Sequence, residues 1–172
     1  FPVGNNVSFH QGRIGKSFGH SLKFSTTYAP THIEGWMAQD SNTLIVGSLN
    51  KIFRYDGANE TNVSKTSDAF NYTNSPRWQS AQLGTAMMMN NGSDVPQFMQ
   101  PDQSRFQDLT AWPTGVFTKC LKPYKSFLIM AGYEGASTKH PFTVRWSDEY
   151  EPTGVPLDYS ITSTTNLAGE NT

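Results

Sequence analysis

The feature that most constrains the fold is a short apolar stretch that occurs three times at nearly equal spacing. The copies contain Leu44-Ile45-Val46, Met87-Met88-Met89 and Leu128-Ile129-Met130. Leu44 and Met87 lie 43 residues apart, and Met87 and Leu128 lie 41 apart. Each stretch is too short for a globular helix, so each predicts a buried strand. A repeat of this length with several strands per copy is typical of β-propeller blades.

The third copy lies in the clearest hairpin of the sequence, residues 126–150. The apolar run from Phe127 to Ala131 ends at Gly132, which predicts a strand buried on both faces. Asp148 can close the second strand, because its carboxylate can accept hydrogen bonds from backbone N–H groups just downstream. That second strand is expected to be half-buried, because apolar and polar residues alternate in the order Phe142, Thr143, Val144, Arg145, Trp146, Ser147.

The same patterns predict an all-β protein, a partial β-propeller of antiparallel blades that repeat at about 42 residues. Strands are expected at 36–39, 43–47, 52–56, 78–81, 85–90, 96–99, 116–121, 126–131 and 142–147. Shorter strands are expected at Val7–Phe9, Leu22–Phe24 and Asp108–Trp112, and outer segments at Phe70, Leu109 and Tyr159. The blade-like repeats would span 33–77, 78–115 and 116–165. An ordinary β-sandwich with coincidental spacing is the alternative fold.

Composition agrees with many short strands and excludes several classes of protein. The chain is 36% hydrophobic, 13% aromatic and 16% charged, and its loops are rich in Asn, Ser, Thr, Gly and Pro. A net charge of −1 gives no electrostatic reason to expect nucleic-acid binding over the whole surface. The single cysteine, Cys120, excludes an internal disulfide and any cysteine-based zinc site. No apolar run approaches the length of a membrane-spanning helix.

We expect the 172 residues to be one β-propeller segment, taken from a longer chain. The sequence begins at Phe1 rather than Met, and three repeats are fewer than the four blades that a closed propeller needs. A terminal blade without a neighbour would expose apolar side chains and an open sheet edge. Neighbouring segments or subunits are therefore expected to complete the burial.

Motifs typical of nucleophilic enzymes occur, but their sequence context is wrong. Residues Gly15 to Gly19 match G-x-S-x-G around Ser17, yet no buried strand precedes them and no amphipathic helix follows. Gly15-Lys16-Ser17 resembles the end of a phosphate-binding loop, whose first glycine is replaced by His10. Ser48 and Lys51 spell S-x-x-K at an expected hairpin tip, without the partner motifs of that enzyme class.

Other candidate groups also fail to converge, so no catalytic, cofactor-binding or metal-binding residue is predicted. Asp148, Glu149 and Glu151 could in principle serve glycoside hydrolysis, but a solvated acidic turn explains them better. The basic residues Lys119, Lys122 and Lys125 are too few for a nucleic-acid groove. The four histidines, His10, His20, His32 and His140, lack the spacing of a compact metal site.

Several segments, in their order along the chain, resemble tail proteins of short-tailed phages. They are LIVGSLNKIFRYDG (44–57), MMMNNGSDVPQF (87–98), SFLIMAG (126–132), FTVRWSDEYEPTG (142–154) and TTNLAGE (164–170). The chain is most similar to the nozzle family, also called tail tubular protein B, and to the related DNA-stabilisation proteins below the portal. The similarity covers about half to two-thirds of the chain, and V-R-W-S-D followed by E-P-T is its most specific part.

This resemblance implies a structural virion protein of the phage tail, without catalysis or cofactor. It implies a ring of identical copies, a hexamer by analogy, that extends the DNA channel and contacts portal, adaptor and other tail proteins. Genomic DNA would pass through without sequence-specific binding. The alternative is a host-recognition or carbohydrate-binding propeller that uses exposed aromatic residues such as Tyr133, Tyr150 and Trp112. A hydrolase that uses Ser17 or the carboxylates at 148–151 is a more distant alternative.

Overall fold

A computed structural model describes most of the chain. The described residues are 7–10, 13–16, 25–38, 41–57, 59–66, 71–135, 139–150, 152 and 154–171. Within these ranges every helix or strand is a β-strand, so the expected all-β class is confirmed. The strand expected at 22–24 and the outer segment expected at Phe70 lie outside the described residues.

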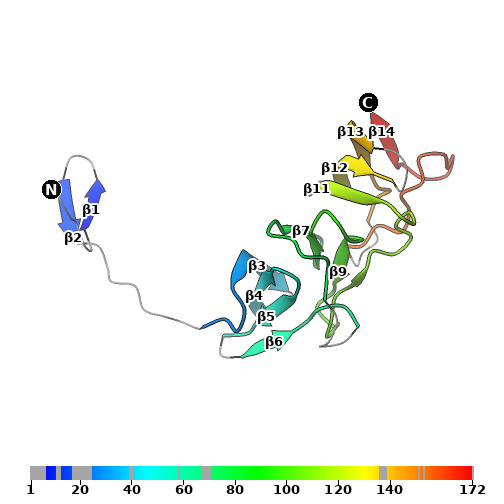
Figure 1. Ribbon diagram of the computed structural model, residues 1–172. Coiled ribbons are helices and arrows are strands. Elements are labelled where there is room, and N and C mark those ends of the chain that lie inside the picture. Colours follow the sequence, from blue (N-terminus) through cyan, green and yellow to red (C-terminus); the bar gives the residue numbers. More distant parts are fainter. Residues whose placement is uncertain are drawn as a thin grey trace.

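Three four-stranded antiparallel sheets make up most of the fold, and in each the strands pair in chain order (Figure 1). The first sheet contains β3 (Pro30–Ala38), β4 (Ser41–Ser48), β5 (Ile52–Tyr55) and β6 (Glu60–Asn62). The second contains β7 (Gln79–Leu83), β8 (Ala86–Asn90), β9 (Gln97–Met99) and β10 (Gln107–Asp108). The third contains β11 (Phe117–Tyr124), β12 (Phe127–Glu134), β13 (Lys139–Trp146) and β14 (Gly169–Asn171). A separate hairpin pairs β1 (Val7–His10) with β2 (Arg13–Lys16).

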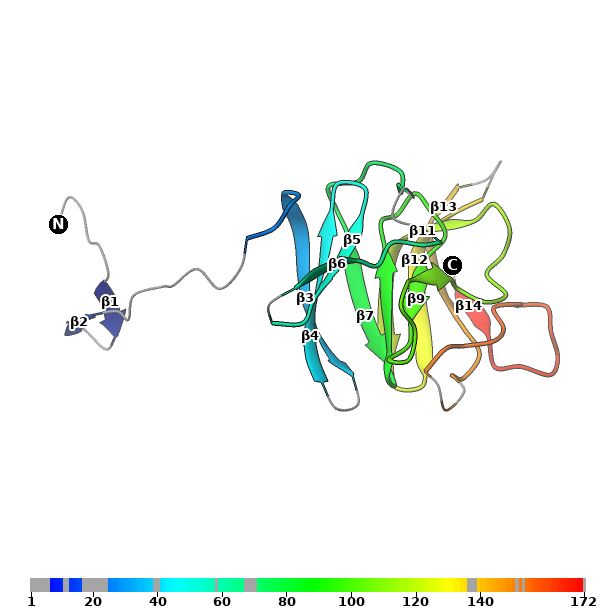
Figure 2. The same cartoon turned by 90° about the horizontal axis from the view of Figure 1, so that it is seen from below.

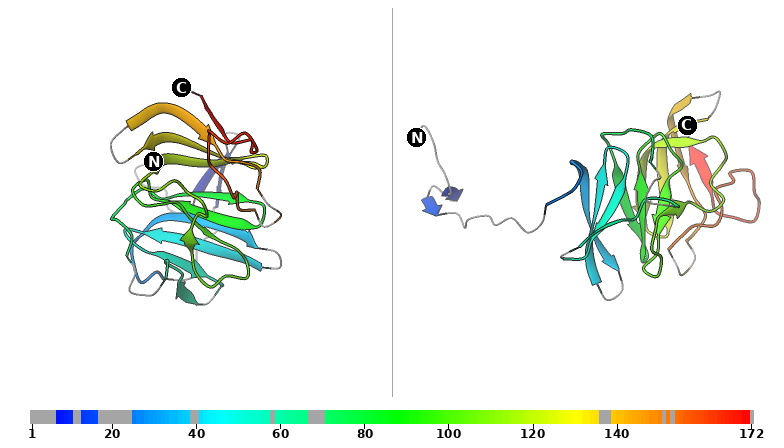
Figure 3. Two further views of the ribbon diagram at one scale, coloured as in Figure 1. Left: turned by 90° about the vertical axis from the view of Figure 1, so that its right-hand side faces the viewer. Right: turned by 60° about the horizontal axis from the view of Figure 1, so that its bottom comes forward.

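The three sheets lie face to face, with the second between the other two (Figure 2). The left view of Figure 3 shows them as successive layers. The first strands of the sheets lie together along one side, because β7 contacts both β3 and β11. This arrangement requires apolar residues on both faces of the second sheet.

The methionine strand β8 meets that requirement. Met87, Met88 and Met89 are all fully buried, but successive side chains point to opposite faces of a sheet. Met87 and Met89 pack with Trp36 and Ile45 of the first sheet. Met88 packs instead with residues of the third sheet. Both faces of this strand therefore carry buried apolar side chains.

Two apolar junctions hold the layers together. The first junction, between the first and second sheets, is formed by Trp36, Ile45, Ile52, Val63, Tyr72, Trp78, Met87, Met89, Met99 and Phe106. The second junction, between the second and third sheets, includes Ala81, Leu83, Ala86, Met88, Phe98, Leu121, Leu128 and Met130, together with Leu109, Trp112, Val116, Val155 and Tyr159 from the loops. Burying a large aliphatic or aromatic side chain contributes roughly 1.5–3 kcal/mol, so these junctions dominate the stability.

The third sheet corrects two expectations about the hairpin at 126–150. Its strand β12 is covered on one face only: Leu128 and Met130 are in the second junction, whereas Ile129 is only partly buried. On β13 the apolar residues lie on the uncovered face, because Val144 pairs with Ala131 and Thr143 is the buried residue. Phe142 is 90% exposed. The alternation was correctly recognised, but the face assigned to it was wrong.

Two outer segments also differ from the prediction. The strand expected at 108–112 is only β10, because the chain turns after Asp108 and Ala111 adopts a positive φ of 56°. The outermost strand of the third sheet is β14, which the sequence analysis did not predict. Tyr159 lies instead in the loop before it, buried against Trp112 with ring centroids 5.1 Å apart.

At Gly154 this C-terminal loop lies in close contact with the second sheet. Its φ is +85°, a conformation that side chains disfavour. A Cβ atom there would lie 2.0 Å from the carbonyl oxygen of Leu83, at the end of β7. Glycine is therefore required both by the backbone conformation and by the close approach.

Candidate functional site

The main group of polar side chains that converge across sheets lies where the first strands meet. His32 and Glu34 are two residues apart on β3, so they point to the same face of the first sheet. Ser80 on β7 contacts both: its Oγ donates to Glu34 Oε2 at 2.7 Å and lies 2.9 Å from His32 Nε2. Lys122 on β11 donates from Nζ to the carbonyl oxygen of Ser80 at 3.3 Å. We call these four residues the inner-edge cluster.

The hydrogen-bond directions show that this cluster is not arranged as a nucleophilic triad. In such a triad the serine donates its proton to histidine, and a carboxylate orients the histidine. Here the serine proton is directed at Glu34, so His32 must donate to Ser80 Oγ rather than accept from it. Ser80 is also buried. The arrangement holds three strands together and does not activate the hydroxyl.

Burial lowers the pKa of His32, and this is the largest influence on it. The nearby carboxylate of Glu34 acts in the opposite direction, while the ammonium of Lys122 lowers the pKa further. Because the net shift is downward, the imidazole is predominantly neutral near neutral pH. A neutral ring can donate one hydrogen bond from Nε2, which fits its contact with Ser80.

Two glutamines of β7 connect the second sheet to the sheets on either side. The Gln79 amide donates to the carbonyl oxygen of Lys119 at 2.8 Å, and its Oε1 accepts from the N–H of Leu121 at 3.0 Å. The Gln79 side chain thus pairs with β11 as a neighbouring peptide group would. Gln82 donates to the carbonyl oxygen of Met37, on β3, at 3.0 Å. The polar contacts at this edge are therefore structural in kind.

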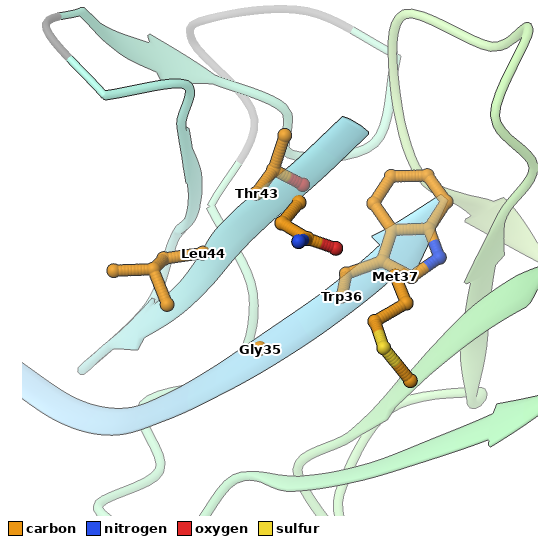
Figure 4. A pocket seen from close by; sticks show the side chains of 6 residues that line it. Gly35, Trp36, Met37, Thr43 and Leu44 are labelled. Atoms are coloured by element: carbon orange, nitrogen blue, oxygen red, sulfur yellow. The ribbon is translucent and has the colours of Figure 1, made fainter. Parts of the chain in front are cut away.

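An open pocket of about 430 Å³ lies beside the last residues of β3 and the first residues of β4. Figure 4 shows Trp36 and Met37 on one strand and Thr43 and Leu44 on the next. The indole N–H of Trp36 already donates to the carbonyl oxygen of Thr85 at 3.0 Å. Among the described residues, the lining is uncharged and offers mainly apolar contact.

A second pocket, of about 380 Å³, lies beside the outer strands of the second sheet and is more polar. Lys65 and Asp108 form an ion pair at its wall, and Gln97 also donates to Asp108. Asp94 accepts from the backbone and hydroxyl of Thr73, at 2.8 and 2.7 Å. Both carboxylates are therefore already engaged by the protein itself.

The candidate residues from the sequence have mostly structural roles. Ser48 and Lys51 form the β4–β5 turn, where Ser48 Oγ accepts from the N–H of Lys51 at 3.1 Å. Asp148 closes β13 as expected, since its Oδ1 accepts from the N–H of Glu149 at 2.9 Å and from that of Leu167 at 3.0 Å. Ser17 and Glu151 lie outside the described residues.

Several of the lysines and aromatic residues considered for binding make contacts within the protein. Lys119 pairs with Glu134 at 3.2 Å, and Lys125 lies in the β11–β12 turn. The expectation that Trp112 is exposed is wrong: it is buried, and its indole N–H donates to the carbonyl oxygen of Val116. The ring of Tyr133 is covered by the guanidinium of Arg145, 3.9 Å from its centroid.

The inner-edge cluster was missed from the sequence because its partners come from distant repeats. His32 and Glu34 carry a local signal, their spacing of two residues on a strand. Ser80 lies more than forty residues away and lacks any signal that links it to them. The described part of the chain contains no group of three or more His, Cys, Asp or Glu residues that could hold a metal ion. Among those same residues, no helix has the length and apolarity needed to cross a membrane.

Comparison with models of known protein families finds no match for this chain, and neither does a search of curated proteins.

Proposed function

We propose that the chain is a structural component of a phage tail, a nozzle or portal-adjacent adaptor subunit that extends the DNA channel. Its three sheets would be consecutive blades of a β-propeller. The protein would have no catalytic role and no cofactor. It would assemble with copies of itself into a ring, a hexamer by family analogy, and contact the portal, the adaptor and other tail proteins in the virion.

One observation carries this proposal: three successive sheets have the same strand order and pack face to face with their first strands together. Propeller blades have this arrangement, because each is a four-stranded sheet that buries its faces against the next. In a β-sandwich two sheets pack face to face, commonly with Greek-key connections that pass from one sheet to the other. Among the described residues, each of the three four-stranded sheets consists of strands that follow one another along the chain.

Most of the segments that resemble nozzle proteins occupy related places in the sheets, and we count this in favour of the proposal. Residues 44–57 include most of β4, its turn and β5, and residues 87–98 include most of β8, its turn and the start of β9. Residues 126–132 and 142–154 include parts of β12 and β13 and the turn after them. Four of the five segments thus fall largely on the middle strands, whereas residues 164–170 reach the outer strand β14.

The charge of the chain agrees with a wall past which DNA moves. A protein that binds DNA without sequence specificity does so mainly through lysine and arginine contacts to phosphates, so a wall that only lines a channel needs no excess of basic residues. This chain has 13 basic and 14 acidic residues. Lys65, Lys119 and Arg145, moreover, are paired with acidic side chains.

The proposal is tested by locating the protein in particles. The natural protein is tagged, particles are purified, and tail complexes are imaged by electron microscopy with a gold-labelled antibody to the tag. We expect label at the tail and ring-shaped averages around a central channel. Untagged particles are the control. Absence of the protein from particles, together with a monomeric state at all concentrations tested, would contradict the proposal.

The alternative function, a carbohydrate-binding propeller, has weaker support. The aromatic residues first considered for it, Trp112 and Tyr133, are occupied by contacts within the protein. A clear hit on a glycan array that is lost on changing Tyr150, the third residue considered, would favour this alternative over the structural one.

A further inference from the structure

The strands β4, β8 and β12, each the second strand of its sheet, share one pattern: alternate residues face the preceding and the following sheet. In β4, Ile45 packs toward the second sheet, whereas Val46 lies in a cluster on the outer face of the first sheet. In β8, Met87 and Met89 face the first sheet and Met88 faces the third. Each second strand therefore presents one set of apolar residues to the preceding sheet and another to the following sheet.

The third sheet obeys the same rule on one side only. Leu128 and Met130 face the second sheet, as Met87 and Met89 face the first. Ile129 occupies the position equivalent to Ile45 and Met88, which both pack against a following sheet. None of the described residues forms such a layer here, and the left view of Figure 3 shows the outer side of β12 and β13 uncovered.

The residues that share this uncovered side can be identified from the strand register. Ile129 pairs with Trp146, and Ala131 pairs with both Cys120 and Val144. Phe142 is two residues from Val144 on the same strand and is 90% exposed, while Val144 is 39% exposed. We call this surface the open face; it consists of Cys120, Ile129, Ala131, Phe142, Val144 and Trp146.

Two of the polar groups near the open face are turned away from it, whereas Asn171, which pairs with Val144, is exposed at its edge. Gly169 of β14 pairs with Trp146, and a Cβ there would lie 2.4 Å from the indole, so the ring lies against the backbone. The indole N–H donates to the carbonyl oxygen of Leu167 at 2.9 Å. Lys122 pairs with Ile129, but its ammonium reaches back to Ser80 in the second sheet. What is left for a partner is a mainly apolar surface with Asn171 at its edge.

A second copy of the chain is a poor occupant. By the rule above, it would have to offer the outer face of its first sheet. That face is already closed, since Val46, Phe53 and Tyr55 are buried there. Tyr28 stacks on Phe53 with ring centroids 5.3 Å apart, and the backbone N–H of Thr27 donates a hydrogen bond to Glu60 Oε2 at 2.9 Å.

We propose that the open face binds a further antiparallel β-sheet, formed by residues other than these 172. This sheet packs on the third as the third packs on the second. Its second strand presents two apolar side chains, separated by one residue, in the manner of Leu128 and Met130. The two observed junctions show how one sheet packs on the next in this protein. The open face has the apolar residues that one side of a third such junction would need. The inference does not depend on the phage-tail function.

Photo-crosslinking of the protein produced from its natural gene tests this proposal. The photoreactive residue p-benzoylphenylalanine replaces Phe142, which is exposed and already aromatic, so the change is tolerated in the fold. A matched variant carries it at Leu49, in the exposed β4–β5 turn. After irradiation, the crosslinked peptides are sequenced by mass spectrometry, with and without the additional substitution Val144→Glu.

The expected product joins position 142 to a peptide outside this sequence in which apolar and polar residues alternate as in a strand. Val144→Glu should reduce its yield by about tenfold or more, because a carboxylate would be buried against apolar side chains. Circular dichroism of the same variant should show unchanged strand content. Crosslinks confined to these 172 residues, to lipid, or no stronger than those of the Leu49 variant would overturn the proposal.

Discussion

The two end faces of the three-sheet stack carry similar apolar side chains but differ in what covers them. On the first sheet, Val46, Phe53 and Tyr55 are buried, with the ring of Tyr28 stacked on Phe53. On the third sheet, Val144 and Phe142 face outward with little cover. The difference therefore lies in the neighbouring segment and not in the strands themselves.

A small number of residues is enough to close a sheet face. Tyr28 is the large side chain over Phe53, and the segment that carries it is fixed by two bonds from Thr27 to the carboxylate of Glu60, at 2.9 and 3.0 Å. The third sheet has no comparable cover among the described residues. The third sheet therefore has the alternating apolar residues that a junction between sheets needs, but none of the described residues packs on them.

The largest expected difference in stability is between a substitution in the second junction and one on the open face. Met88→Ala should lower the free energy of unfolding by about 2–5 kcal/mol, because Met88 fills the second junction. Val144→Ala should lower it by less than about 1 kcal/mol, since Val144 is partly exposed. Urea unfolding followed by tryptophan fluorescence measures both. Equal costs would mean that the open face is covered within the chain.

A second contrast separates backbone strain from contact between sheets. Gly154→Ala should cost roughly 2–4 kcal/mol, because its Cβ would overlap the Leu83 carbonyl in addition to the strain at positive φ. Gly57→Ala is the matched control: its φ is also positive, at 98°, but a Cβ there meets nothing within 4 Å. It should cost only about 1–2 kcal/mol. Similar melting temperatures for the two variants would contradict the tight contact at Gly154.

Removing the cover of the first sheet should make its outer face resemble the open face. Tyr28→Ala is expected to cost about 1 kcal/mol, because it removes an aromatic stack on Phe53. Hydrogen exchange of the amides in β5 should become faster, whereas exchange in β12 should not change. If β5 exchanges at the original rate, Tyr28 does not protect this face.

The smallest expected effect concerns pH at the inner-edge cluster. Because the folded-state pKa of His32 is lowered, the unfolded chain binds a proton at this site more readily. Stability should therefore be fully present above the unfolded value of about 6.5 and decrease as pH falls below it. His32→Gln, whose amide can still donate to Ser80, should make the decrease between pH 7.5 and 5.5 shallower by about 0.5 kcal/mol. Parallel pH profiles for the two proteins would contradict this role.

The hairpins of the fold could be predicted from sequence because turn residues and apolar runs mark them locally. Leu44, Met87 and Leu128 lie at equivalent places in their sheets, as their spacing predicted. The short strands β6 and β14 were not predictable and the bounds of β10 were wrong, because two or three mostly polar residues become a strand only through pairing with a neighbour.

The open face and the inner-edge cluster could not be predicted for two different reasons. Alternation along β13 fixes that Phe142 and Val144 share a face, but the pairing register with β12 decides which face it is. The contact of Ser80 with His32 joins residues of different repeats, and only the packing of the sheets brings them together. Neither the register of β13 against β12 nor the contact between Ser80 and His32 can be predicted from local sequence patterns.

The comparison of the two end faces is tested most directly by carbene footprinting of the folded chain, analysed peptide by peptide. A photolysed diazirine labels exposed side chains regardless of their chemistry. The account predicts strong labelling at Phe142 and Val144, and labelling of Phe53 and Met88 that appears only after unfolding. Labelling of Phe53 as strong as that of Phe142, or protection of Phe142 and Val144 in the isolated chain, would contradict it.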